Sequence, residues 1–204
     1  MLRLILMLSL LIAAPLMAEQ KAVDIYSQAQ LLKMIRNHTY LQQIKADNCQ
    51  IVQDIEAHAD VLKEPLYQYL WGEMLNYGVC VKADPASGIQ QLRAAADQGS
   101  AEAMVRLAEY YAQGKFLMKD KQRAVQYVYP AAANGDLPAQ MMLVKLFGEG
   151  YGSPRDYMMA YHWLYNQTFN DTKTQEQASV LLAKLAGKLP ASQLEQAKKA
   201  TVHR

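Results

Sequence analysis

Two cysteines, Cys49 and Cys80, are the side chains of this 204-residue chain best suited to covalent or metal chemistry. A metal site would need further ligands at close spacing, but none of the four histidines forms such a pair with either cysteine. In an oxidising compartment, two cysteines allow one bridge and leave no thiol over. For an exported chain we therefore predict a Cys49–Cys80 disulfide, which closes a loop of about 30 residues and contributes roughly 3–4 kcal/mol.

Three glycines, Gly148, Gly150 and Gly152, form a G-x-G-x-G run that could be mistaken for a phosphate-binding loop. A nucleotide-binding loop of this kind follows a β-strand, and no strand is predicted before this run, so a turn between helices is favoured. The motifs H-E-x-x-H, G-x-S-x-G and S-x-x-K of zinc proteases, serine hydrolases and penicillin-binding proteins are missing from the sequence. We therefore expect no enzymatic activity, no cofactor and no metal site.

Three aspartates, Asp84, Asp120 and Asp156, lie 36 residues apart and could form a repeated carboxylate site. Each precedes a predicted helix, so a helix cap, which accepts hydrogen bonds from free backbone N–H groups, is the favoured interpretation. Trp71, Trp163 and most tyrosines stand at helical spacing, which favours core packing over an aromatic ligand site.

These residues belong to an internal repeat of 36 residues. Gly78, Gly114 and Gly150 share this spacing with the three aspartates, and Gly99 stands 36 residues before Gly135. Small residues at 88, 124 and 160 keep the same register, which lets helices approach closely. A fixed period of this length is typical of solenoids, whose units bury their apolar faces against one another.

Each repeat has the pattern of a helix hairpin. In the second, Ala103, Leu107 and Tyr111 are spaced by four and mark one face of a helix, which Gly114 ends where a left-handed backbone is needed. Asp120 then caps a second helix. We therefore predict an all-α fold, a right-handed α-solenoid of such hairpins.

The first residues have the features of a secretory signal peptide. Arg3 precedes an apolar run at 4–14, and the small residue Ala18 comes just before a polar stretch. The run is well short of the roughly 20 residues of a membrane helix, so cleavage after Ala18 is favoured over an uncleaved anchor. We expect residues 1–18 to be removed, and the exported chain to stay out of the membrane and lie in the periplasm.

Helical caps are predicted at both ends of the repeats. Ser27 with Gln30 predicts a capping box that opens a helix through about residue 37, and Asp47 with Gln50 predicts another through about residue 62. Two closing helices are expected at 174–188 and 191–200, separated by Pro190. The expected division is 19–64 for the N-terminal cap, about 65–100, 101–136 and 137–172 for the repeats, and 173–204 for the C-terminal cap and tail.

A solenoid of this kind presents a concave surface lined by the first helix of each hairpin, and that surface is suited to binding proteins. The core pattern leaves six positions free on these helices, which we predict as partner-binding residues: Tyr69, Glu73, Arg106, Glu109, Met142 and Lys145. The chain has 21 Lys and Arg against 19 Asp and Glu, a formal net charge of +2. This balance gives no electrostatic reason to expect nucleic acid as a partner.

The repeats resemble the Sel1-like repeat, a relative of the tetratricopeptide solenoids. The second unit carries the signature at Ala103, Leu107, Tyr111, Gly114, Asp120, Ala124, Tyr127, Ala131, Ala132 and Gly135. The third unit has Gln167 and Thr168 in place of the Ala-Ala pair, as expected of a terminal repeat.

Particular stretches also resemble the MotX family of flagellar motor proteins, over roughly residues 26–199. They are residues 45–50, 78–81 and 151–166, and the first two contain the cysteines. The resemblance implies a periplasmic scaffold in a ring around the flagellar basal body, with MotY as partner and a PomB-type stator subunit to recruit or hold. It implies no catalytic step. The alternative is a general periplasmic Sel1-repeat adaptor or signalling regulator without a flagellar role.

Overall fold

The computed structural model describes residues 26–199, so the expected signal peptide at 1–18 and the end of the tail at 201–204 lie outside the described part. Within this range the regular elements are all helices. Their bounds are α1 Gln28–Arg36, α2 Tyr40–Ala46, α3 Val52–Asp60, α4 Pro65–Tyr77, α5 Pro85–Asp97, α6 Ala101–Gln113, α7 Lys121–Ala133, α8 Leu137–Gly148, η1 Pro154–Asp156, α9 Tyr157–Tyr165, α10 Thr172–Ala186 and α11 Ala191–Lys199.

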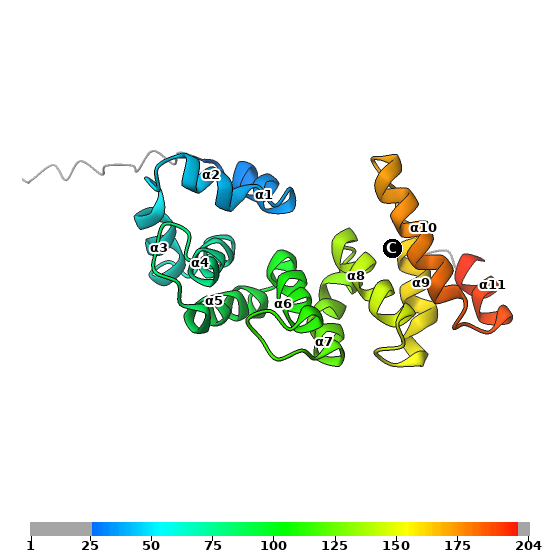
Figure 1. Ribbon diagram of the computed structural model, residues 1–204. Coiled ribbons are helices and arrows are strands. Elements are labelled where there is room, and N and C mark those ends of the chain that lie inside the picture. Colours follow the sequence, from blue (N-terminus) through cyan, green and yellow to red (C-terminus); the bar gives the residue numbers. More distant parts are fainter. Residues whose placement is uncertain (1–25, 200–204) are drawn as a thin grey trace, which may run out of the picture.

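The helices pair into hairpins that follow one another along an extended, curved stack (Figure 1). The pairs α4/α5, α6/α7 and α8/α9 form three successive units, and α10 and α11 pack at the far end. The buried apolar residues form two clusters that meet at α6, where Leu107 packs with the N-terminal cluster and Ala108 with the C-terminal one. The predicted fold class, an all-α solenoid of helix hairpins with helical caps, is confirmed.

Glycine ends the first helix in two of the three hairpins. Gly78 and Gly114 stop α4 and α6 with φ of +64° and +77°, in the left-handed region that side chains disfavour. Gly88 serves another purpose, because a Cβ placed there would lie 2.3 Å from Asn76 Oδ1 and 2.6 Å from the Gly72 carbonyl oxygen. The missing side chain therefore lets α4 and α5 pack closely.

Two of the three repeated aspartates cap helices as predicted. Asp84 accepts a hydrogen bond from Ser87 N at 3.2 Å, and Asp120 accepts one from Arg123 N at 2.9 Å. The prediction is wrong for Asp156, whose side chain makes no cap bond to α9. There Pro154 opens a 3-10 turn, and Ser153 caps that turn instead by accepting from Arg155 N.

The N-terminal cap differs from the prediction after its first helix. The capping box of Ser27 and Gln30 is present at α1. Asp47 does not open a helix: it follows the unpredicted helix α2, and its carboxylate accepts hydrogen bonds from Tyr26 and Gln43. The next helix, α3, begins at Val52 without a side-chain cap. Residues 48 and 49 adopt left-handed backbone conformations, so no helix can run through them from Asp47.

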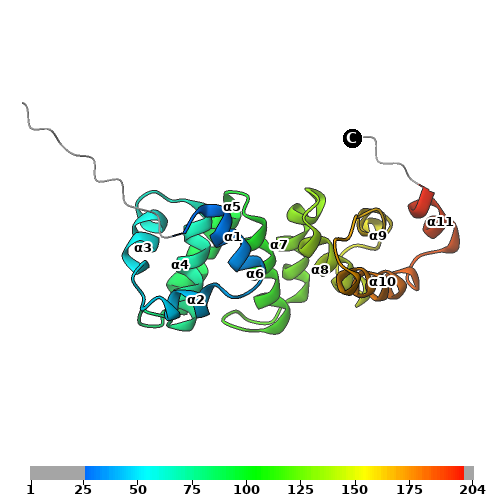
Figure 2. The same cartoon turned by 90° about the horizontal axis from the view of Figure 1, so that it is seen from above.

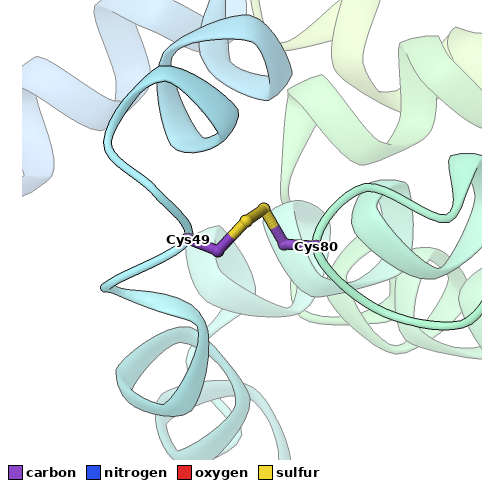
Figure 3. The surroundings of a disulfide bond; sticks show 2 residues. All are labelled: Cys49 and Cys80. Atoms are coloured by element: carbon purple, nitrogen blue, oxygen red, sulfur yellow. A yellow bond between two sulfur atoms is a disulfide. The ribbon is translucent and has the colours of Figure 1, made fainter.

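The Cys49–Cys80 disulfide is present and joins the loop before α3 to the loop between α4 and α5 (Figure 3). The two Cα atoms are 5.6 Å apart, within the usual range for a disulfide. The bridge ties the N-terminal cap to the first hairpin. In a view from above, α1 and α2 lie across α4 and α6 (Figure 2).

At the other end, Asp171 caps α10 by accepting from Thr174 N at 2.8 Å, and α11 follows Pro190. Both helices lie close to the predicted bounds. Across residues 26–199, no helix has both the length and the apolar character needed to cross a membrane.

Candidate functional site

A groove of about 690 Å³ lies between the end of α1 and the inner side of the repeats. Its apolar lining includes Val105 of α6, Leu137 and Met142 of α8, and Ile35 of α1. Its polar lining comes from the end of α1, from α6 and from the loop between α7 and α8: Arg36, His38, Glu102, Arg106, Glu109, Asn134 and Asp136. Apolar walls with a few charged groups are typical of sites that bind another molecule.

Helix α6 lies at the centre of the groove. Its sequence forms a well-capped, amphipathic helix. Ser100 caps it by accepting from Ala103 N at 3.2 Å, and Gly114 ends it. Ala103 and Leu107 are fully buried on one face, whereas Arg106 and Glu109 keep some exposure on the groove side. The same amphipathic pattern that stacks the repeats therefore presents charged side chains to the groove.

A polar cluster lies beneath the groove and centres on Glu73, whose side chain is fully buried. Its carboxylate accepts hydrogen bonds from Tyr40 at 2.6 Å, Tyr110 at 2.5 Å and Asn76 at 3.1 Å. Arg106 lies 3.2 Å away and completes an ion pair. A buried carboxylate is tolerated only with such partners, because an unpaired charge in the interior is strongly unfavourable.

The electrostatics of this cluster keep its tyrosines neutral and its arginine charged. Burial raises the pKa of the Tyr69 hydroxyl to about 12, although the nearby Arg106 guanidinium opposes the shift. Burial also raises the pKa of Tyr40 and of Tyr110, and the Glu73 carboxylate adds to both shifts. Burial alone would lower the pKa of Arg106, but Tyr69 and Glu73 outweigh it and hold the pKa above its ordinary value.

Helix α1 is held over the groove by contacts to α6. Arg36 pairs with Glu102 at 3.0 Å, and His38 Nδ1 lies 3.1 Å from Arg106 Nη2. Arg106 also pairs with Glu109 at 2.7 Å. Near the other rim, Asp136 caps α8, and burial raises the pKa of its carboxyl group.

Four of the six predicted partner-binding residues line the groove: Tyr69, Arg106, Glu109 and Met142. The side chain of Tyr69 is nonetheless buried, and its hydroxyl accepts a hydrogen bond from Arg106 at 3.0 Å. The expectation of a free side chain is wrong for Tyr69 and Glu73, because the N-terminal cap folds over this part of α4. Lys145 is exposed but lies outside the lining of the groove.

Arg36 and His38 were not predicted as site residues. Both stand at or just after the end of α1, 66 to 68 positions before their partners on α6. Helical periodicity is a local signal and does not show onto which repeat a capping helix folds. The local signal for a polar contact here is Arg36, a cation in the last turn of the helix.

Most of the charged groups of the groove are held in ion pairs, an arrangement suited to binding. Gly148, Gly150 and Gly152 lie at the end of α8 and in the loop after it, with helices on both sides. Among residues 26–199, no group of three or more His, Cys, Asp or Glu side chains could hold a metal ion.

Comparison with known proteins agrees with this architecture. The Sel1 repeat matches residues 65–100, 101–136 and 137–165. The sodium-type polar flagellar protein MotX of Vibrio parahaemolyticus is 39% identical over 177 residues, which cover 87% of this chain and 84% of that protein. The chain belongs to the MotX family. The match extends beyond the repeats, so it includes at least part of the caps as well as the hairpins.

Solved structures support the fold of this MotX-family chain. A Sel1 repeat protein from Oxalobacter formigenes aligns with a TM-score of 0.55 at 24% identity, covering 63% of this chain and 97% of that one. A protective antigen from uropathogenic Escherichia coli strains, described as an SLR fold, aligns with a TM-score of 0.53 at 27% identity. That alignment covers 66% of this chain and 28% of the antigen.

Proposed function

We propose that this chain is a periplasmic, non-enzymatic scaffold of the bacterial polar flagellar motor. It acts in a ring around the basal body, where together with a MotY-like protein it recruits or stabilises the stator through a PomB-type subunit. The observation that carries this proposal is the 39% identity to a sodium-type polar flagellar protein over most of both chains. The disulfide supports export, because structural disulfides persist in oxidising compartments.

The groove is the surface we assign to partner contact. It is concave, it combines apolar walls with charged rims, and Arg106, Glu109 and Met142 reach it from two successive repeats. The buried ion pair of Glu73 and Arg106 fixes the position of α6 within it. A partner segment bound there would contact both the repeats and the end of α1, so the cap contributes to recognition.

The proposal is tested by deleting the gene and measuring swimming in soft agar, with the wild-type copy returned as a control. Loss of swimming with flagella still assembled is the expected result. An epitope-tagged copy should form polar spots that disappear in a strain without basal bodies, and the periplasmic protein should copurify with motor proteins. Unimpaired swimming and diffuse localisation would contradict the motor role and favour a general periplasmic adaptor.

A further inference from the structure

A second hollow, of about 460 Å³, lies on α5, α6 and α7 and shares no residue with the groove. It is lined by Arg93, Tyr111, Arg123, Gln126 and Tyr127. In Figure 1, α5 and α7 lie along the lower side of the molecule, away from α1. Two cations and no carboxylate line this pocket, which we call the arginine pocket.

The aromatic rings of the arginine pocket hold its cations in place. Arg93 Nη2 donates to the Tyr111 hydroxyl at 3.1 Å, and the Arg123 guanidinium lies 5.4 Å from the centre of the Tyr111 ring. The Tyr111 and Tyr127 rings stack with their centres 5.4 Å apart. Tyr111 itself is buried, so the wall of the pocket is fixed by the core.

The positive charge of the arginine pocket is only partly balanced within the described part of the chain, by one long ion pair of Arg123 with Asp120. Arg93 has no ion pair there, and its Nε is buried without a hydrogen-bond partner. Arg123 comes no closer than 4.0 Å to Asp120, whose other carboxylate oxygen caps α7. In the groove, by contrast, both arginines are paired with glutamates. The arginine pocket therefore has two guanidinium groups with little compensating negative charge, which favours an anion as its ligand.

We propose that the arginine pocket binds a carboxylate of an acidic segment of a partner protein. Guanidinium groups match carboxylates because their planar forks can donate two parallel hydrogen bonds. The volume exceeds that of one carboxylate, so neighbouring residues of the segment fit beside it. Gln126, whose side chain is exposed, and Tyr127 also line the pocket and can contact these neighbouring residues.

Further features support a peptide as the source of the carboxylate. The three elements of the pocket come from two successive hairpins, so a bound segment would contact more than one repeat. Burial raises the pKa of Tyr111, but hydrogen bonds from Arg123 and Arg93 outweigh it and lower the pKa below the ordinary value, as expected of a strongly positive site. The proposal does not depend on the motor role.

The test measures binding of a fluorescent, end-blocked peptide, Gly-Asp-Glu-Asp-Gly, to the purified full chain at low salt. The isosteric Gly-Asn-Gln-Asn-Gly peptide is the control ligand. We expect the acidic peptide alone to bind, and Arg93→Gln or Arg123→Gln to weaken its binding by about tenfold each, because each removes a charge-assisted contact. Arg93→Lys keeps the charge without the fork, and we expect an intermediate loss.

Arg155→Gln is the matched control, because Arg155 is exposed in η1 and outside the pocket. Thermal melting by circular dichroism confirms that each variant is folded, and Arg123→Gln, at an exposed side chain, keeps the test open if Arg93→Gln does not fold. An equal loss in Arg155→Gln would show unspecific attraction and overturn the proposal. So would competition by free succinate or phosphate as strong as that of the peptide, or no binding of the acidic peptide at all.

Discussion

Glu73 of α4 and Arg106 of α6 form an ion pair of 3.2 Å, in which the carboxylate is fully buried and the guanidinium is 13% exposed. This pair joins the first two hairpins, and the hydroxyl of Tyr40 brings the N-terminal cap to the same carboxylate at 2.6 Å. Three parts of the molecule therefore depend on one side chain. Its removal should affect the whole N-terminal half rather than one helix.

We expect Glu73→Ala to lower the free energy of unfolding by about 3–5 kcal/mol, because the variant leaves the Arg106 charge without its buried partner. Urea denaturation followed by circular dichroism measures the change. Glu109→Ala removes a more exposed partner of the same arginine and should cost less than about 1 kcal/mol. Similar losses in both variants would contradict a special role for the buried pair.

The disulfide should stabilise the protein by anchoring the N-terminal cap. Cys49→Ser or Cys80→Ser opens a loop whose ends are 31 positions apart, and we expect a loss of about 3–4 kcal/mol with lower abundance in the periplasm. Urea denaturation and protease resistance of the purified variants provide the measurement. The double variant should lose no more than either single variant, because each already removes the bridge. Unchanged stability would show that α1–α3 hold to the repeats without it.

The repeats and the closing helices could be predicted because their signals are local. Gly78 and Gly114, which are 36 residues apart, indicate left-handed backbone conformations that few other residue types adopt. The buried cluster could not be predicted, since Glu73 stands at a position that the core pattern leaves free, and only the placement of Tyr40 over it makes it a buried residue. That placement depends on α2 and on left-handed residues at 48 and 49, where a polar sequence gave the false sign of a helix cap.

Gly152 offers a test of the third repeat's loop. A Cβ there would lie 2.3 Å from Phe147 Cε1, and φ is +79°, so Gly152→Ala should cost about 2–4 kcal/mol from overpacking and a disfavoured backbone. Gly135→Ala is the matched control, because its φ is +90° but nothing lies within 4 Å of the added Cβ. We expect that variant to lose about 1–2 kcal/mol. Equal losses, measured by thermal melting, would mean that Phe147 moves aside.

Alkaline pH should destabilise the fold through its buried tyrosines. The pKa of Tyr69 is about 12 in the folded state and 10.0 for the ordinary side chain, so the folded state keeps a proton that the unfolded state loses. The stabilisation is therefore complete below about pH 10 and lost as pH rises through about 12. In urea titrations across this pH range, the free energy of unfolding of Tyr69→Phe should fall less steeply with pH than that of the wild type. The difference in slope should be up to about 1.4 kcal/mol per pH unit. Parallel curves for the two proteins would contradict the assignment.

The groove can be tested directly as a partner surface. Met142→Glu places a charge on its apolar wall, and an unpaired carboxylate buried at an interface should weaken copurification of motor partners at least about tenfold. Val180→Glu makes the same change at a side chain of α10 that is 70% exposed and outside the groove, and should leave binding unchanged. Lys145→Ala tests whether the interface on α8 is confined to the groove or extends to the outer face of this helix. If the groove alone is the contact, this variant copurifies normally and swims, whereas a loss equal to that of Met142→Glu would extend the interface beyond the groove to the outer face of α8.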